Sequence, residues 1–341
     1  MRNILNGSNP EPVLEHWDLS NGAGCVIANI PEATLTCIDF WCKAGSAEEA
    51  NGEEGLAHFL EHMVFKGSRN MNEGDFDLKI EEVGGSSNAS TGLDDVHFHV
   101  LVPPTETVAA LEALLELVLM PEINKKAFNI EREVVLEEIA QNIDNPEEQL
   151  FQQLFTLCWP NHTYGKPILG KRETIRCMSA EKMKSFHQRQ YLGRNCTIAI
   201  AGDLPKNIRS IISSSYLSSL SKDTKTINKS SKKAKPSFSP GKKEIRIQRL
   251  EAARIAMAWE LPPAKEQLYI MGADIATTLL CEGRLSRLVK RLREELQIVE
   301  SIEMDLHILE RGGLVLLEVC CPTENISKVE NEINLILLKS I

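Results

Sequence analysis

Residues 55–68 read Gly-Leu-Ala-His-Phe-Leu-Glu-His-Met-Val-Phe-Lys-Gly-Ser, and the apolar spacing predicts a helix over Leu56–Phe65. This helix contains His58-Phe59-Leu60-Glu61-His62, an H-x-x-E-H pattern. Two histidines four positions apart lie on one helix face, about 6 Å apart along the axis. That separation lets both imidazoles bind one zinc ion, with Glu61 beside the second as a proton acceptor. The alternative is a helix that carries two histidines by chance.

A further predicted helix, about Lys125–Asn142, offers carboxylates for a third metal ligand. Glu131 and Glu138 are two helical turns apart and therefore lie on one face. One can bind the metal while the other orients one of the metal ligands. We interpret Glu133 and Glu137 as parts of a solvated charged face.

Two stretches of the chain predict the same order of elements, which is strand, helix, helix, strand, strand, helix. They are residues 34–120 and residues 254–338, and in the second stretch we expect the second helix over Arg284–Leu296. The sequence therefore predicts an α+β fold with two homologous halves. The corresponding helix of the second half, Gln267–Leu280, has no histidine, so the histidine pair is not needed to build the fold.

The first half continues from Pro121 to Leu220 beyond its last matching helix, whereas the second half stops at Ile341, so we expect an incomplete second half. The expected domains are a metal-binding domain over residues 1–217 and a partial second domain over residues 244–341. Between them, residues 218–243 are rich in Ser and Lys and predict an exposed linker. The alternative, a basic arm for nucleic acid, would need more interleaved aromatic residues.

The composition of the 341 residues excludes several function classes. A net charge of −10 argues against nucleic acid or an anionic membrane as the main partner. No apolar run approaches the roughly 18 residues of a membrane span, and the N-terminal residues do not resemble a secretory signal. The nine cysteines have no regular spacing, which favours small buried side chains over a disulfide framework or a cysteine metal site. We therefore expect a cytoplasmic protein, in a bacterial cytosol or an organelle stroma or matrix.

Residues 55–68 resemble the signature of the insulinase/pitrilysin (M16) metallopeptidases, in particular the processing-peptidase-like branch. The spacing of that family's third zinc ligand places it on Glu138, and its auxiliary glutamate falls on Glu131. Residues 84–91 are similar to the family's substrate-binding edge strand, and residues 165–170 resemble a further family segment. The resemblance implies two related α+β halves that close on an unfolded peptide.

The same resemblance implies a division of roles. Zinc is expected on His58, His62 and Glu138, with Glu61 activating a zinc-bound water and Glu131 as the auxiliary residue. Substrate contacts are expected from Asn88, Ala89, Ser90, Thr91 and Arg293. Active members place a Tyr seven residues after the Arg, whereas this chain has Glu300, which cannot donate to an oxyanion unless it is protonated.

We therefore expect a zinc endopeptidase that hydrolyses unfolded peptides. An alternative is a metal-binding but poorly active subunit that binds peptides or a second M16-like chain in a heteromeric peptidase. A third reading is a zinc hydrolase that does not act on peptides. The expected partners are unfolded peptides and either a second copy or another M16-like chain, with no nucleic acid and no membrane.

Overall fold

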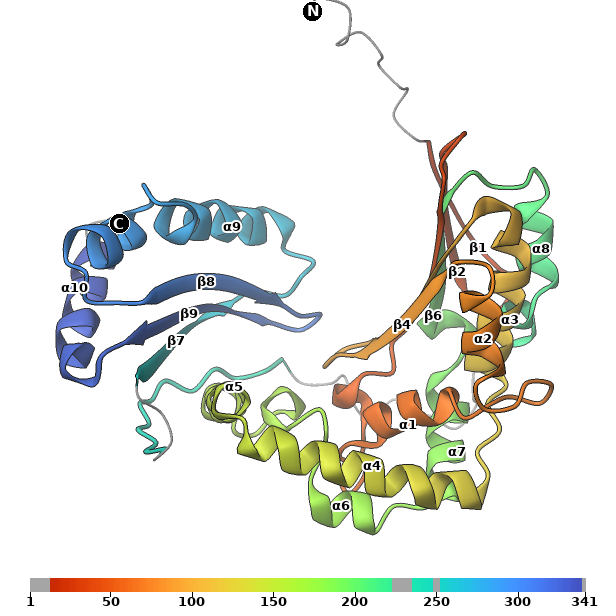
Figure 1. Cartoon of the computed structure of the whole chain (residues 1–341), viewed down its shortest axis with the longest axis horizontal. Coiled ribbons are helices and arrows are strands. Elements are labelled where there is room, and N and C mark those ends of the chain that lie inside the picture. The colour runs from red at the N-terminus through yellow and green to blue at the C-terminus, as the bar shows by residue number, and fades with distance from the viewer. Residues whose placement is uncertain (1–12, 223–234, 248–251, 339–341) are drawn as a thin grey trace, which may run out of the picture. The chain divides into compact units, whose positions relative to one another are not determined.

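The computed structural model describes residues 13–222, 235–247 and 252–338, and it divides them into two compact units (Figure 1). The first unit contains residues 13–139 and 167–222. The second contains residues 140–166, 235–247 and 252–338. Residues 223–234 of the expected linker lie outside the described residues, and the domain boundaries expected from the sequence stay a prediction.

The first unit is built on a six-stranded sheet in the order β1-β2-β6-β3-β5-β4. The pair β2–β6 is parallel and the other pairs are antiparallel. In β3, β5 and β6 the residues alternate between buried and partly exposed, because successive side chains of a strand point to opposite faces. The strands are β1 (Leu14–Asp18), β2 (Gly24–Asn29), β3 (Thr36–Cys42), β4 (Ser86–Thr91), β5 (Val96–Val102) and β6 (Cys196–Gly202).

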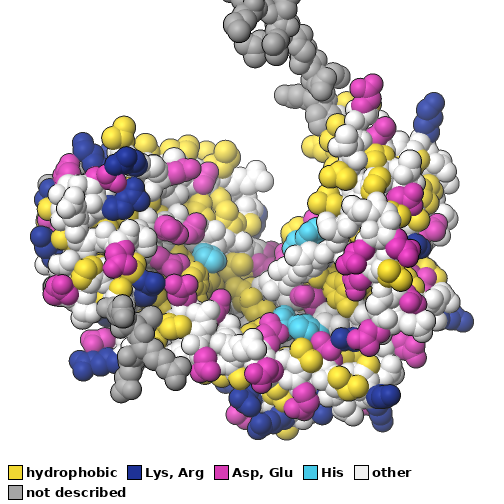
Figure 2. All heavy atoms as spheres, viewed as in Figure 1, with side chains coloured by type: hydrophobic (Ala, Val, Ile, Leu, Met, Phe, Trp, Pro, Cys, Tyr) yellow, Lys and Arg dark blue, Asp and Glu magenta, His cyan; other side chains and the backbone are white. Residues whose placement is uncertain are grey.

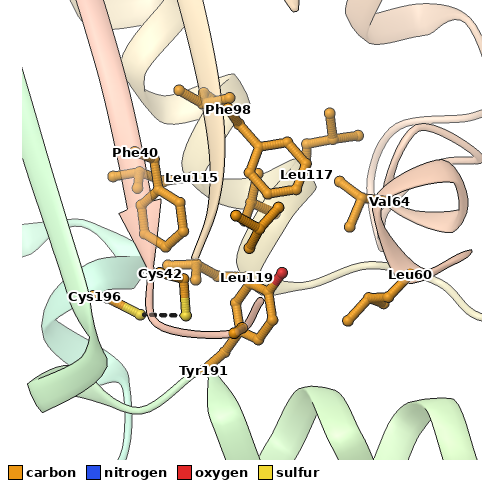
Figure 3. Close-up of a cluster of buried hydrophobic side chains, with 14 of the residues drawn as sticks. Phe40, Cys42, Leu60, Val64, Phe98, Leu115, Leu117, Leu119, Tyr191 and Cys196 are labelled. Atoms are coloured by element: carbon orange, nitrogen blue, oxygen red, sulfur yellow. Dashed lines mark hydrogen bonds between the residues drawn. The ribbon is translucent and has the colours of Figure 1, made fainter. Parts of the chain in front are cut away.

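Helices cover the buried face of this sheet. Figure 3 shows side chains of β3 and β5, such as Phe40 and Phe98, beside side chains of the helices, such as Leu60 and Leu115. Leu60 belongs to α1, so the core fixes one face of the helix that carries the two histidines. The helices of the first unit are α1 (Leu56–Val64), α2 (Asp75–Glu81), α3 (Thr107–Leu119), α4 (Lys125–Asp144), α6 (Arg172–Arg176), α7 (Ala180–Gln190) and α8 (Ile208–Ser214). The last residues of α4, from Ala140 onward, belong to the second unit.

The second unit contains an antiparallel three-stranded sheet in the order β7-β9-β8. Its strands are β7 (Ala253–Leu261), β8 (Ser301–Ile308) and β9 (Gly313–Cys321). Its helices are α5 (Pro146–Cys158), α9 (Gln267–Cys281) and α10 (Ile326–Leu338), and residues Val289–Glu295 form a π-helical segment. No helix within the described ranges is long and apolar enough to cross a membrane.

The predicted duplication is confirmed by the pairing of the strands. In the first unit the order β3-β5-β4 places the second strand of the repeat at the edge, and the order β7-β9-β8 does the same in the second unit. The chain therefore has the expected α+β fold with two related halves.

One expectation for the second half was wrong in its details. The helix expected over 284–296 begins later and is wound as a π-helix. The residues before it form a turn instead, because Gly283 has a φ of 79° and the hydroxyl of Ser286 donates to its carbonyl oxygen at 2.7 Å.

Candidate metal centre

The backbone before α1 holds this helix in place. Gly55 precedes the helix with a φ of 91°, a conformation that glycine adopts without strain. A Cβ atom at Gly55 would lie 2.5 Å from the carbonyl oxygen of Leu169, so the close approach of these two backbone segments also requires glycine. On the other side, the ring of Phe59 stacks on that of Phe128 of α4, with centroids 4.7 Å apart. Helices α1 and α4 are thereby packed together.

Three side chains from these two helices converge. The Nε2 atom of His58 lies 3.5 Å from one carboxylate oxygen of Glu138, and the Nε2 atom of His62 lies 3.4 Å from the other. The two imidazole rings have centroids 4.7 Å apart. In Figure 2, histidine side chains reach the surface beside acidic ones where Figure 1 places α1. The exposed fraction of the side chains rises from 11% at His58 to 39% at Glu138, so the cluster opens to solvent on the Glu138 side.

This donor set fits a zinc ion. Catalytic zinc sites commonly use three protein ligands, and two histidines with one glutamate are one such set. With zinc–ligand bonds of about 2.0–2.1 Å, the edge of a tetrahedron is about 3.3–3.4 Å long. The His58–Glu138 and His62–Glu138 distances, each to a different carboxylate oxygen, are close to that edge, and one ligand atom from each residue lies within 4.8 Å of the others. Among the described residues this is the only such group of His, Cys, Asp and Glu side chains.

The charges in the cluster favour metal binding. Burial lowers the pKa of His58 to about 4 against the opposing charge of Glu138, so the imidazole is neutral, as a metal ligand must be. The hydrogen bond with His62 keeps the pKa of Glu138 below its ordinary value. Burial acts to lower the pKa of His62, but its contacts with Glu138 and Glu131 outweigh burial and raise it. The Glu131 and Glu138 carboxylates thus place negative charge around the two imidazoles, which favours a cation.

Glu131 lies behind His62. Its carboxylate is buried and lies 2.9 Å from the Nδ1 atom of His62. A hydrogen bond from Nδ1 to a carboxylate selects the tautomer in which Nε2 is free to bind a metal. The second oxygen of Glu131 lies 2.9 Å from the amine of Lys66, which also contacts Glu73 at 2.9 Å.

The sequence analysis gave no role to Lys66 or Glu73. Lys66 lies in the turn after α1, which ends at Val64, so helical spacing from His62 does not extend to it. Glu73 gives no signal either, because its contact with Lys66 depends on how the chain folds back after α1.

Glu61 also belongs to this cluster. The hydroxyl of Thr91, the last residue of β4, donates a hydrogen bond to its carboxylate. Burial raises the pKa of Glu61, and the bond from Thr91 opposes that rise. The carboxylate therefore lies at the junction between the histidine helix and the edge of the sheet.

The structure places the expected substrate-binding residues in different units. Asn88, Ala89, Ser90 and Thr91 lie on β4, which pairs only with β5 among the described strands and so forms the sheet edge. Arg293 lies on the π-helical segment of the second unit, where its guanidinium contacts the Glu294 carboxylate at 3.1 Å. The substrate roles of all these residues stay predictions.

The contact between Lys66 and Glu131 leads to a testable expectation. Lys66→Met keeps the length of the side chain but removes the charge, so the buried Glu131 carboxylate loses a cationic partner and holds His62 less firmly. We expect zinc affinity, measured by competition with a chromophoric chelator, to fall about tenfold. Lys79→Met, on an exposed position of α2, is the control. Equal zinc affinity in both variants would contradict the role of Lys66.

Comparison with known proteins identifies the family of the chain. The sequence model of the insulinase family, peptidase family M16, matches residues 25–172, and that of the peptidase M16 inactive domain matches residues 178–339. An uncharacterized zinc protease of Mycobacterium leprae is 26% identical over 315 residues, which are 89% of this chain and 68% of the relative. The beta subunit of the mitochondrial-processing peptidase of Lentinula edodes is 26% identical over 303 residues, which are 85% of this chain and 65% of that subunit. The chain thus spans about two thirds of the length of these relatives.

A solved structure shows the same fold. A protease from Helicobacter pylori superposes with a TM-score of 0.83 over 96% of this chain and 79% of that chain, at 24% sequence identity. The matches of the two family models, taken together, extend through both halves of the sequence. The chain therefore belongs to the insulinase family of peptidases, family M16.

Proposed function

We propose that the chain is a zinc endopeptidase that hydrolyses unfolded peptides. The observation that carries this proposal is the convergence of His58, His62 and Glu138 on one point, with Glu61 beside them. The names of relatives such as the zinc protease of Mycobacterium leprae support the reaction class.

Each residue of the cluster has a role in this proposal. Zinc on His58, His62 and Glu138 would lower the pKa of a coordinated water toward about 7 and polarise a peptide carbonyl. Glu61 accepts a proton from the attacking water and passes it to the leaving amine. Thr91 orients the Glu61 carboxylate through its hydroxyl, and Glu131 orients His62.

The edge strand supports an extended peptide as the substrate. An edge strand presents backbone donors and acceptors that another extended chain can pair with. Strand β4 ends at Thr91, whose side chain bonds Glu61, so a peptide paired with β4 runs toward the carboxylate that handles the proton. Recognition through the backbone gives loose sequence preference and selects unfolded segments, because a folded strand has its backbone groups occupied.

A second candidate function is a metal-binding subunit that is poorly active by itself. Glu300 favours it, since it stands where active members of the family offer a Tyr, and its carboxylate accepts a hydrogen bond from the thiol of Cys320 at 3.2 Å. Under this candidate the chain works with a second copy or with another M16-like chain.

The test is the hydrolysis of a quenched, unstructured peptide by the purified full chain. We expect turnover with one equivalent of zinc, loss of turnover after chelation, and recovery when zinc is added back. A chain that binds zinc but hydrolyses the peptide no faster than the Glu61→Gln variant would support the second candidate, a poorly active subunit. Zinc-dependent cleavage of a small ester or amide without cleavage of the peptide would indicate a different hydrolase. A chain that does not bind zinc would contradict all three.

A further inference from the structure

The N-cap residue of α1 provides no side-chain acceptor, and the Leu56 N–H donates to the backbone carbonyl of Glu53 at 2.9 Å. The first N–H groups of a helix have no partner within the helix and need an acceptor from elsewhere. Gly55 occupies the N-cap position and has no side chain to accept from them, and the first turn contains no acidic residue. This end of the helix lies one turn before His58, so its support bears directly on the position of a metal ligand.

Glu49 supplies the missing acceptors from outside the helix. One oxygen of its carboxylate accepts a hydrogen bond from the backbone N–H of Gly55 at 3.0 Å, and the other accepts from that of Ala57 at 2.8 Å. Both oxygens are thus engaged with the helix terminus, where a negative charge is favoured by the helix dipole. Burial raises the pKa of Glu49 to about 8, the two backbone hydrogen bonds oppose that rise, and nearby Glu54 and Glu53 add to it. The ionised form that accepts both hydrogen bonds therefore becomes dominant as the pH rises through about 8.

The loop that joins Glu49 to α1 is itself held. The Glu53 carboxylate accepts from the backbone N–H of Ala50 at 2.9 Å and from the guanidinium of Arg189 of α7 at 2.6 Å. The hydroxyl of Thr174 donates to the carbonyl oxygen of Glu54 at 2.9 Å. The Glu49 carboxylate therefore approaches α1 from a loop that α6 and α7 fix in place.

The two histidines differ in how they are supported. The Nδ1 atom of His62 has a buried carboxylate partner, Glu131. The Nδ1 atom of His58 is buried and has no hydrogen-bond partner among the described residues. The orientation of His58 thus depends on its backbone and on packing, and the amide directly before it, that of Ala57, is bound by Glu49.

We propose that Glu49 is a positioning residue of the metal centre. Its carboxylate binds the backbone N–H groups at the start of α1 and thereby fixes the orientation of His58, as Glu131 fixes that of His62. This inference rests on the metal centre of the proposed function. It extends that centre to a residue nine positions before His58, on a different segment of chain.

The test compares metal binding by full-length variants. Glu49→Ala removes both acceptors, and Glu49→Gln keeps the shape but leaves one oxygen for two N–H donors. We expect Glu49→Ala to weaken zinc binding about 10- to 100-fold, as the loss of an outer partner of a ligand does, and Glu49→Gln to weaken it less. Glu54→Gln is the matched control, because Glu54 is a carboxylate of the same loop and accepts from the loop N–H of Gly52.

A second readout separates positioning from a general loss of stability. The visible absorption of the cobalt-substituted chain reports the geometry of the ligands, and we expect it to change in Glu49→Ala and Glu49→Gln. Ile80→Val weakens the core at α2, a helix that carries none of the cluster residues, and should lower the unfolding temperature without changing the cobalt spectrum. If Glu49→Ala does not fold, the zinc affinity and cobalt spectrum of Glu49→Gln test the proposal.

The outcomes are distinguishable from failure of the proposed function. A wild-type chain that binds no zinc would contradict the metal centre itself. A wild-type chain that binds zinc, with unchanged affinity and cobalt spectrum in both Glu49 variants, would overturn the role of Glu49 alone. An equal loss of zinc affinity in Glu54→Gln would also overturn the role of Glu49. The loss would then result from the charge of the loop rather than from the hydrogen bonds between Glu49 and the start of α1.

Discussion

Glu138→Gln is expected to weaken zinc binding by more than the roughly 100-fold that an outer partner of a ligand can contribute. Glu138 is the acidic member of the three-residue cluster, and its two oxygens lie 3.5 and 3.4 Å from the Nε2 atoms of His58 and His62. The amide of Gln is neutral and directs one N–H₂ group at a site built for a cation. The variant therefore loses a donor atom and the charge that attracts the ion.

The measurement is competition between the chain and a chromophoric chelator, followed by the thermal unfolding temperature with and without zinc. A ligand that binds only the folded state stabilises it by mass action, so the zinc-dependent rise in unfolding temperature should disappear in Glu138→Gln. Glu137→Gln is the matched control, since Glu137 precedes Glu138 on α4 and is exposed. If Glu138→Gln retained the affinity of Glu137→Gln, Glu138 would not be a ligand.

The metal cluster could be predicted because its parts follow helical spacing. His58 and His62 share a helix face through their separation of four, and Glu131 and Glu138 share a face through their separation of seven. The pairing of these two helices did not follow from spacing. It came from the family resemblance, and in the structure it rests on core contacts such as that between Phe59 and Phe128.

The residues that support the histidine ligands could not be predicted from the sequence. Lys66 and Glu49 are ordinary charged residues in a chain of which 25% is charged, and neither completes a motif. Lys66 gains its role from Glu131, which lies on another helix. Glu49 gains its role from a loop that turns back to the start of α1. Such contacts depend on tertiary structure, which local patterns do not encode.

Local sequence patterns also do not show which residues belong to which of the two units. Residues 140–166, with helix α5, pack in the second unit, although the chain returns to the first unit from residue 167 onward. Side chains of α5 contact the second sheet; the ring of Phe155, for example, lies 5.5 Å from that of His307 of β8. A composition shift marks a linker, but a helix that leaves one unit for another has no such mark.

Glu61→Gln should retain zinc and lose hydrolysis. Glu61 is not one of the three converging ligands, and its carboxylate is held by the hydroxyl of Thr91. Gln keeps the shape and still offers one oxygen to Thr91, so the helix and the metal ligands should stay in place. It cannot take up a proton, however, and general acid–base catalysis contributes about 10²- to 10⁴-fold to a rate. We expect kcat for peptide hydrolysis to fall within that range.

Two quantities, zinc affinity and kcat, are measured in the same preparation. Zinc affinity reports whether the ligands are intact, and kcat reports whether the proton can move, so an unchanged affinity with a reduced kcat assigns Glu61 to the chemical step. Glu138→Gln is expected to give the opposite pattern, a loss of affinity that an excess of zinc partly offsets. A Glu61→Gln chain that cleaves the peptide at the wild-type rate would show that another group handles the proton. Because Glu61 is the carboxylate beside His62 that contacts the edge strand, such a result would remove the link between the metal cluster and the proposed pairing of a peptide with β4.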